Sequence, residues 1–271
     1  MSFDLDAYLA RIKLPARPTL DEHGLAAVQR AHRLHIPFEN LDIRLGRGIR
    51  IDSESVFAKL VTAKRGGYCF EQNRLFLDAL TELGFTARTL LARVLLGATG
   101  TPGLTHMLLL VTIDGQEWIA DAGFGGSYAP PMPLVAGAEA TAPDGALFRL
   151  IEDERGWVLI RNGPIGATDG RGGSGAVDQY SFLLTEVAQA DLDMSNHWTA
   201  TAPGTRFVDM AIVSIALPTG YAALNDRKYG RHAGGVDTMA QIDDPRVYRL
   251  RLSMMFGIDL SAEDVAALGL F

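Results

Sequence analysis

The chain has 271 residues, of which 48% are hydrophobic and 21% are charged, and its formal net charge is −7. This length predicts two or three compact units, and the composition is ordinary for a globular protein. The negative charge argues against nucleic acid or an anionic membrane as a partner, although a local basic pocket for a phosphorylated cofactor remains compatible with it.

The N-terminal sequence lacks the basic region and apolar stretch of a signal peptide. The longest apolar run, 107–111, is far too short to cross a bilayer. The chain holds one cysteine, Cys69, and a free thiol suits a reducing compartment. We therefore expect a cytoplasmic protein that does not contact membranes.

The first eighty-odd residues have the spacing of helices. Thr19 and Glu22 form a capping-box pattern ahead of an apolar stripe, and Pro37 ends this first element. A second helix is expected to begin at Asp52 or Ser53 and to stop before residue 66.

The third helix begins at Cys69, which lies in the run Arg65-Gly66-Gly67-Tyr68-Cys69-Phe70-Glu71-Gln72-Asn73. The apolar spacing after the cysteine is helical, and Gly84 closes the element. A thiol in the first turn of a helix faces the positive end of the helix dipole, which favours the thiolate. The paired glycines allow close backbone approach. Without these neighbours, a lone cysteine is more often a small buried hydrophobe than a nucleophile.

From residue 86 to about 187 the pattern changes to short strands between turn residues. The expected strands are 89–96, 105–113, 118–121, 147–152, 157–161 and 180–184. Two stretches, 136–146 and 162–176, are rich in Gly, Ala, Pro and Asp and are predicted to be mobile loops.

After Asp191 the pattern is mixed. A strand is expected over 207–217, with a partner strand over 221–227. Asp244 and Pro245 are typical of a helix start, and that helix is expected to run through 256 and stop at Gly257. Ser261 begins a last helix.

A cysteine nucleophile needs a base and a group that orients the base. Of the six histidines, only His106 lies inside an apolar strand, and that strand ends at Asp114-Gly115, a strong two-residue hairpin signal. A two-residue turn places His106 and Asp121 on one face of the hairpin as diagonal neighbours. A three-residue turn would place them on opposite faces. Read alone, His106 could be a core histidine and Asp121 the end of a strand.

Glycines follow Asp121 in the run Gly123-Phe124-Gly125-Gly126. Their backbone N–H groups could meet an anion or a carbonyl oxygen, or the run could be only a tight turn. His32 and His35 are three residues apart without a third ligand type nearby, so no metal site is expected.

These segments resemble the arylamine N-acetyltransferase family. The resemblance is carried by Ile36-Pro37-Phe38-Glu39-Asn40-Leu41-Asp42, by the run around Cys69, by Thr105-His106-Met107, and by Asp121-Ala122-Gly123-Phe124-Gly125. The second half matches less closely: residues 196–207 resemble a serine-rich family stretch ending in Arg-Phe, but Ala200, Gly204 and Thr205 replace the usual serines.

The resemblance implies an α+β fold with a papain-like or transglutaminase-like Cys-His-Asp core. Its units would be a helical bundle over 1–84, a β-barrel over 85–190 and an α/β lid over 191–271. It further implies that Glu39 and Arg65 are buried partners near the site, since a carboxylate and a guanidinium inside a bundle need each other.

The implied reaction moves an acetyl group from acetyl-CoA to the nitrogen of an arylamine, arylhydrazine or arylhydroxylamine, a role in xenobiotic metabolism. It would proceed by a ping-pong mechanism through acetyl-Cys69, with His106 as base and Asp121 as its orienting group. By the same resemblance, the acceptor pocket is lined by Phe38, Val94 and Phe124. Coenzyme A would contact Phe70, Thr105, Gly125, Gly126 and Phe207.

Two other functions use the same residues. A peptidase or transglutaminase-like enzyme would share the three catalytic groups, and a non-catalytic relative would bind an aryl compound or coenzyme A without turnover. The physiological acceptor, the preferred acyl-CoA donor and the oligomeric state are not fixed by the sequence, and a homo-oligomer is compatible with it.

Overall fold

The computed structural model of the chain describes residues 3–163 and 175–271. The helices are α1 Leu5–Arg11, α2 Glu22–His35, α3 Leu41–Arg44, α4 Ser53–Phe57, the π-helical turn η1 Ala58–Thr62, α5 Cys69–Leu83, α6 Gln189–Thr201, α7 Arg206–Asp209, α8 Pro245–Phe256 and α9 Ala262–Ala267. The strands are β1 Phe38–Glu39, β2 Thr86–Val94, β3 Leu104–Ile113, β4 Gln116–Ala120, β5 Met132–Pro133, β6 Glu139–Thr141, β7 Leu147–Asp153, β8 Gly156–Gly163, β9 Gly175–Phe182, β10 Ile212–Leu217, β11 Gly220–Asn225, β12 Lys228–Ala233 and β13 Val236–Gln241.

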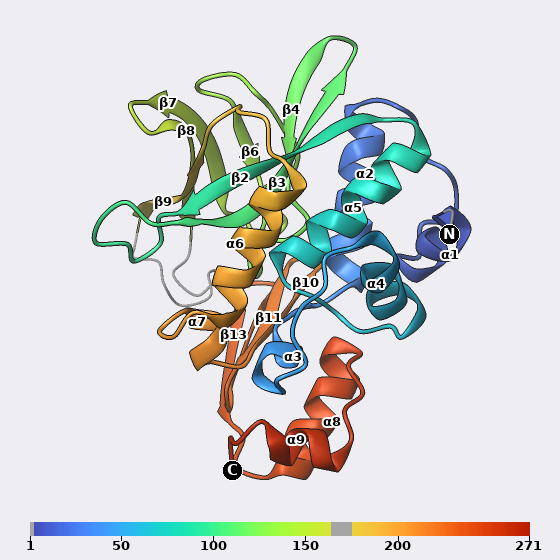
Figure 1. The fold of residues 1–271 in the computed structure, drawn as a ribbon, viewed down its shortest axis with the longest axis vertical. Coiled ribbons are helices and arrows are strands. Elements are labelled where there is room, and N and C mark those ends of the chain that lie inside the picture. The colour runs from blue at the N-terminus through green and yellow to red at the C-terminus, as the bar shows by residue number, and fades with distance from the viewer. Residues whose placement is uncertain (1–2, 164–174) are drawn as a thin grey trace.

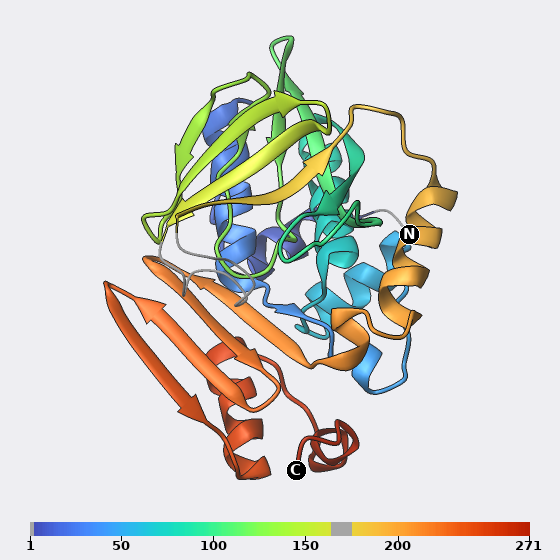
Figure 2. The same cartoon turned by 90° about the vertical axis from the view of Figure 1, so that its left-hand side faces the viewer.

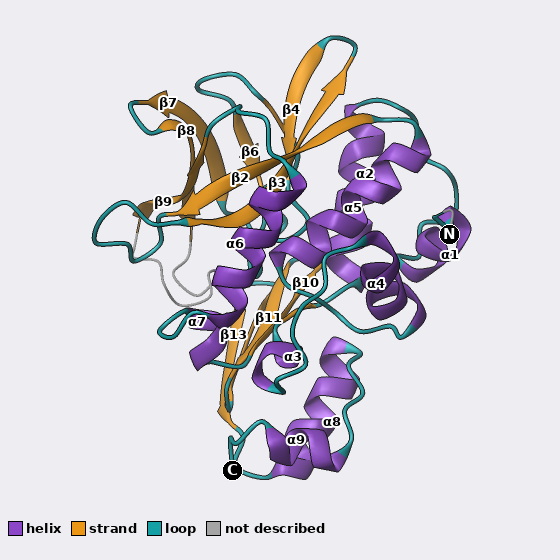
Figure 3. Ribbon diagram, in the orientation of Figure 1, coloured by secondary structure: helices purple, strands orange, loops and turns teal. Residues whose placement is uncertain are grey.

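The elements form three layers (Figure 1). The N-terminal helices pack together on one side, and α5 lies against β2 and β3. An eight-stranded antiparallel sheet, in the order β5-β4-β3-β2-β9-β8-β7-β6, curls into a nearly closed barrel (Figure 2). A five-stranded sheet, β1-β10-β11-β12-β13, lies below it with α8 and α9 (Figure 3). The predicted α+β fold with bundle, barrel and lid is confirmed.

Three groups of buried apolar side chains form the core. One is centred on helices α1 to α5, one lies inside the barrel, and one joins the five-stranded sheet to α8 and α9. The first group also contains Met107 and Leu109 of β3 and Ile212 of β10. Because this group crosses the proposed boundaries at 84 and 190, the division into three domains stays a prediction.

Side-chain caps determine where the helices begin. The Asp21 carboxylate accepts the Gly24 N–H at 2.8 Å, so Asp21 caps α2. The predicted capping box of Thr19 and Glu22 is therefore wrong, because the Thr19 hydroxyl donates to Asp21 at 2.7 Å instead. The other predicted helix ends are confirmed at Asp52, Gly84, Asp244, Gly257 and Ser261.

The predicted strands need several corrections. The strand expected over 207–217 begins only at Ile212, because α7 occupies Arg206–Asp209. The stretch 136–146 is not all loop, since it contains β6. Helix α6 and the hairpin β12–β13 were not predicted. The loop expected over 162–176 falls largely outside the described residues, and its described ends belong to β8 and β9.

Within residues 3–163 and 175–271, the helices are all too short or too polar to cross a membrane.

Candidate active site

Cys69 is the first residue of α5 and is 3% exposed. The segment before it runs beside β1, where the Glu39 N–H donates to the Gly67 carbonyl at 3.0 Å. A Cβ on Gly66 would lie 2.2 Å from the Pro37 carbonyl oxygen. Close approach, as the sequence predicted, is what requires glycine here.

The hairpin of β3 and β4 places the base beside its partner. Ile113 pairs with Gln116, and both turn residues have positive φ, 49° at Asp114 and 81° at Gly115, as a two-residue turn of this kind requires. The predicted register is therefore confirmed. Asp121 lies one residue beyond β4, and its Oδ2 lies 2.7 Å from His106 Nε2.

Two groups besides His106 hold the Asp121 carboxylate in place. Its Oδ1 accepts the Asn73 Nδ2–H at 3.0 Å and the Gly123 N–H at 2.8 Å. The Asn73 amide also donates to the Met107 carbonyl and accepts the Ala122 N–H at 2.9 Å. Asn73 therefore joins α5, β3 and the loop after β4 at one point.

The backbone of Asp121 is fixed from a different helix. Its N–H donates to Gln29 Oε1 of α2 at 2.9 Å. Sequence reasoning assigned no role to Asn73 or to Gln29. The only available signal was that Asn73 lies one helical turn after Cys69, on the same helix face.

The pKa values of the His106–Asp121 pair move in opposite directions. Burial disfavours charged His106, but the charge of Asp121 and its hydrogen bond outweigh this, with help from Cys69, and raise the pKa of His106 to about 10. Burial opposes the Asp121 carboxylate as well, yet His106, Asn73 and Gly123 together lower its pKa. At neutral pH the pair is therefore an imidazolium and a carboxylate.

The thiol lies beside this cation. Because Nε2 of His106 faces Asp121, Nδ1 is the ring nitrogen left for Cys69. The Cys69 Sγ also lies 3.7 Å from the Thr105 carbonyl oxygen. A cation next to the sulfur stabilises the thiolate, so the geometry supplies a nucleophile, a proton carrier and an orienting carboxylate.

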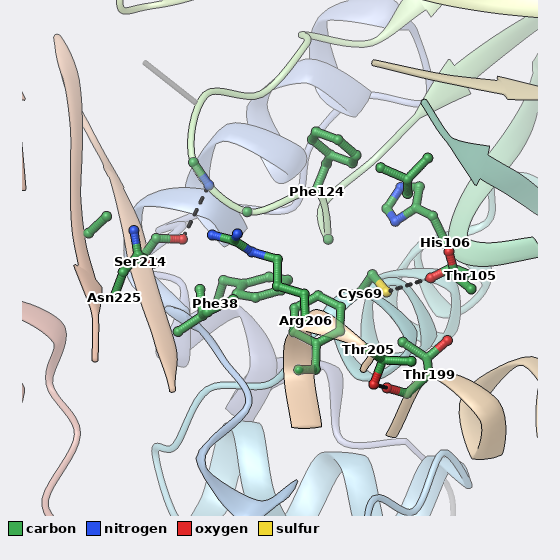
Figure 4. Close-up of a pocket in the computed structure, with 17 residues that line it drawn as sticks. Phe38, Cys69, Thr105, His106, Phe124, Thr199, Thr205, Arg206, Ser214 and Asn225 are labelled. Carbon is green, nitrogen blue, oxygen red and sulfur yellow. Dashed lines mark hydrogen bonds between the residues drawn. The ribbon is translucent and has the colours of Figure 1, made fainter. Parts of the chain in front are cut away.

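Figure 4 shows the cavity onto which Cys69 and His106 open. Its volume is about 220 Å³. It is lined by Phe38, Cys69, Val94, Thr105, His106, Gly123, Phe124, Gly125, Gly126, Thr199, Thr205, Arg206, Phe207, Ile212, Ser214, Ala223 and Asn225.

All three residues predicted for an acceptor pocket, Phe38, Val94 and Phe124, line this cavity. So do Thr105, Gly125, Gly126 and Phe207 from the predicted coenzyme A set. Phe70 does not: it is fully buried in the core, with its ring centroid 5.5 Å from that of Tyr68. Its contact with coenzyme A therefore stays a prediction from the resemblance. The lining residues after position 190 that had not been predicted are Thr199, Thr205, Arg206, Ile212, Ser214, Ala223 and Asn225.

The glycine loop after Asp121 uses its N–H groups internally. Gly123 donates to Asp121, Gly125 donates to the Gly123 carbonyl at 3.2 Å, and Gly126 donates to the Ser214 hydroxyl at 3.2 Å. Of the two interpretations that the sequence left open for this run, the tight turn fits these contacts, because the three N–H groups have acceptors within the chain.

Gly123 has no room for a side chain. A Cβ there would lie 2.5 Å from Asn73 Nδ2 and 2.8 Å from Cys69 Cα. We expect Gly123→Ala to push the loop away from Cys69 and to lower kcat/KM by about 100-fold, since displacements of 1 Å at a site have effects of this size. Steady-state kinetics checks this. Gly100→Ala is the control, because a Cβ at Gly100 meets nothing within 4 Å; equal activity of the two variants would contradict the expectation.

A cluster of ion pairs supports the turn before Cys69. Arg65 lies 2.7 Å from Glu39 and 3.1 Å from Asp42, and Lys59 lies 2.8 Å from both Asp42 and Glu71. The predicted contact between Glu39 and Arg65 is confirmed. The other carboxylate oxygen of Glu71 accepts the N–H of Tyr68 at 3.1 Å. The cluster therefore reaches the first turn of α5.

A second buried network reaches the same turn from α1 and α2. The Tyr8 hydroxyl lies 2.9 Å from His32 Nδ1, and His32 Nε2 lies 2.6 Å from Gln72 Oε1. The Gln72 amide donates to the carbonyls of Pro37 and Gly67. Gln72 therefore accepts from a neutral His32 that carries its proton on Nε2, and Tyr8 donates to the other ring nitrogen.

This network predicts acid sensitivity. Burial lowers the pKa of His32 to about 3, so between pH 6.5 and 3 the unfolded chain binds a proton that the folded chain refuses. Stability is therefore lost as pH falls, by up to about 1.4 kcal/mol per pH unit from this group. Guanidinium unfolding at pH 4.5, 5.5 and 7 should give a shallower dependence in His32→Gln, whereas exposed His23→Gln should match the parent. Equal slopes for parent and His32→Gln would contradict this.

The chain is similar in sequence and in structure to known acetyltransferases. A family model described as N-acetyltransferase matches residues 20–265. The arylamine N-acetyltransferase of Escherichia coli is 40% identical over 80% of this chain and 74% of its own length. The structure of the Salmonella typhimurium arylamine N-acetyltransferase superposes with a TM-score of 0.89 at 32% identity over 98% of both chains. The Mycobacterium marinum arylamine N-acetyltransferase in complex with CoA gives a TM-score of 0.89 at 28% identity over 98% of both chains.

Proposed function

The chain belongs to the arylamine N-acetyltransferase family and is a transferase, and from this premise we propose how it works. It transfers an acetyl group from acetyl-CoA to the nitrogen of an arylamine, arylhydrazine or arylhydroxylamine, through an acetyl-Cys69 intermediate. Family membership favours this reaction over the peptidase and binding-module alternatives. Cys69 is the nucleophile, His106 the proton carrier and Asp121 the group that orients and charges the imidazole.

The first half-reaction acetylates the enzyme. The Cys69 thiolate attacks the thioester carbonyl of acetyl-CoA, and the bond from that carbon to the coenzyme A sulfur breaks. His106 enters this step as an imidazolium, so its proton can pass to the departing sulfur. The products are acetyl-Cys69, neutral His106 and free coenzyme A.

The second half-reaction restores the resting state. The nitrogen of the acceptor attacks acetyl-Cys69, and neutral His106 takes the proton that the nitrogen loses. The bond from the acetyl carbon to the cysteine sulfur breaks and leaves the thiolate. Asp121, 2.7 Å from Nε2, stabilises the imidazolium that forms again. Protons balance over the two steps without a further donor.

The cavity walls suit a flat aromatic acceptor. Phe38 and Phe124 line the space next to Cys69, and Val94 adds an apolar contact. Aromatic side chains favour aryl rings through stacking and through burial of apolar surface. These three residues are therefore proposed to bind the acceptor.

The donor is proposed to share the same cavity. Thr105, Gly125, Gly126 and Phe207 line it and are proposed to contact coenzyme A. The structure of the Mycobacterium marinum relative in complex with CoA, which matches this chain over 98% of its length, supports acetyl-CoA as co-substrate. A cavity that the two substrates share favours the release of coenzyme A before the acceptor binds.

The observation that carries this proposal is the contact of His106 with Asp121 beside Cys69, at the wall of one aromatic-lined cavity. The test is steady-state kinetics with acetyl-CoA varied at several fixed concentrations of an arylamine or an arylhydrazine. Parallel double-reciprocal lines are expected, because each half-reaction ends before the other substrate enters. Intersecting lines would contradict the acetyl-enzyme mechanism.

The division into domains at residues 84 and 190, a cytoplasmic location and a role in xenobiotic metabolism stay predictions. A panel of arylamines and hydrazines, with acetyl-, propionyl- and malonyl-CoA as donors, would identify the preferred substrates.

A further inference from the structure

Arg33 is a buried cation directly behind the site. It lies on α2, is 2% exposed, and was given no role by the sequence. Its Nη1 donates to the Ala122 carbonyl at 3.1 Å, and its Nη2 donates to the Gly126 carbonyl at 2.8 Å. One guanidinium therefore joins both ends of the loop that carries Phe124 into the cavity.

Burying this charge is costly, so its position needs a cause. A buried guanidinium normally faces a carboxylate that accepts its hydrogen bonds. Here the bonds go to carbonyl groups, and within the described part of the chain Arg33 Nε has no hydrogen-bond partner. Burial lowers the pKa of Arg33, while the charge of Asp121 and then that of Tyr128 act in the opposite direction. The nearby anion that favours the charged form of Arg33 is therefore the orienting carboxylate of the site.

Arg33 is the fully buried cation that offsets Asp121 near the thiol. Asp121 carries one negative charge and the His106 imidazolium one positive charge, and a thiolate at Cys69 adds a second negative charge to this group. Arg33 supplies the second positive charge. Without it, the buried group would hold a net negative charge, which low dielectric surroundings disfavour.

We propose that Arg33 is a positioning residue of this site with two separable roles. Its charge offsets Asp121, so that the Cys69 thiolate and the His106 imidazolium are stable together. Its two hydrogen bonds hold the 122–126 loop in place, so that Phe124 forms a wall of the acceptor pocket. The second role depends on the proposed function, whereas the first concerns only the ionisation of Cys69.

Other charged or titratable groups face the same region. Tyr180 of β9 packs against His106 with ring centroids 5.1 Å apart, and burial, with Asp121, raises its pKa well above the usual value. Burial, with the charge of Cys69, likewise raises the pKa of Tyr68 well above the usual value. These phenols stay neutral through the pH range in which cysteines titrate. Arg206 of α7 lines the cavity and stays charged, so its effect on the titration of Cys69 does not change with pH.

The surroundings of Arg33 itself are also constant. Tyr128 lies beneath the guanidinium at 5.2 Å from ring centroid to Cζ, and burial raises its pKa. His32, the residue before Arg33, is neutral above about pH 3. Glu71, in the same helical turn as Cys69, titrates in the cysteine range, since burial raises its pKa to about 7. Glu71 is common to the parent and to every Arg33 variant, so the lost charge is identified by comparing Arg33→Gln with the still-charged Arg33→Lys.

The charge is tested by the pH dependence of Cys69 alkylation with iodoacetamide, in the parent, Arg33→Gln and Arg33→Lys. At an effective dielectric of about 20, the loss of a nearby buried charge shifts a titration by about 1 pH unit. We expect the midpoint to rise by about that much in Arg33→Gln and to stay near the parent value in Arg33→Lys. Arg17→Gln, an exposed arginine in the segment before α2, is the control and should titrate like the parent.

The loop role is tested by KM for a bulky arylamine. Lysine keeps the charge but has a single nitrogen, so it cannot reproduce the two fixed bonds to Ala122 and Gly126. We expect Arg33→Lys to raise KM for the arylamine about 10-fold, with a smaller change for a small hydrazine that does not fill the pocket.

A parent-like midpoint in Arg33→Gln would overturn the charge role, and a parent-like KM in both variants would overturn the loop role. Should Arg33→Gln not fold, a raised midpoint in the still-charged Arg33→Lys would contradict the charge role. Alkylation needs neither acetyl-CoA nor an acceptor. A shifted midpoint in Arg33→Gln with no acetyl transfer by the parent would therefore count against the proposed function and leave the charge role intact.

Discussion

Replacing Cys69 by Ala is expected to lower acetyl transfer by about 10⁴-fold or more, since removal of a covalent nucleophile has effects of this size. The side chain is small and 3% exposed, and it packs among the apolar residues of the N-terminal helices. The fold should therefore survive the change. The measurement is acetylation of an arylamine with acetyl-CoA at saturating concentrations of both.

Binding provides the control for this variant. Cys69→Ala should still bind acetyl-CoA and the arylamine, because the aromatic walls of the cavity are untouched. Equilibrium binding by calorimetry would show this. A Cys69→Ala protein that acetylates an aromatic hydrazine at the parent rate would remove the basis for every assigned role in the site.

Asp121→Asn has the second-largest expected effect, a loss of about 10³–10⁴-fold in kcat, by analogy with loss of the orienting carboxylate in other nucleophilic enzymes. The raised pKa of His106 depends on Asp121. Without that charge, burial favours neutral imidazole, and the cation beside Cys69 is lost at neutral pH. Both turnover and alkylation of Cys69 at pH 7 should fall.

Asp114→Asn is the matched control for this change. Asp114 is exposed, lies in the turn of the same hairpin, and has a φ of 49°, which asparagine tolerates well. It should keep parent activity and parent alkylation rates. If Asp121→Asn alkylated as fast at pH 7 as the control, the raised pKa of His106 would not be the source of the thiolate.

Local sequence signals predicted the elements that position Cys69, His106 and Asp121. The Asp114-Gly115 turn and the alternation around it were sufficient to fix the register of β3 and β4, because side-chain direction alternates strictly along a strand.

Helix α6 was missed because its buried residues, Leu192, Asn196 and Thr199, include two polar side chains and give no apolar stripe. The strand expected over 207–217 was assigned too early because apolar Phe207 and Val208 match a strand pattern, although they lie in α7.

The supporting residues of the site could not be predicted in the same way. Gln29 and Arg33 lie on α2, and they contact the loop after β4 about 90 positions along the chain. No local pattern relates positions so distant, and only the packed fold brings them together. The polar side of the cavity, with Thr199 and Ser214, likewise depends on how α6 and β10 meet the barrel.

The most direct test of the central claim is the intact mass of the protein after brief mixing with acetyl-CoA in the absence of an acceptor. We predict a gain of one acetyl group, located on Cys69 by peptide mapping, and its loss when an arylamine is added. A protein that acetylates arylamines while its own mass stays unchanged, or that carries the acetyl group elsewhere, would contradict transfer through this sulfur.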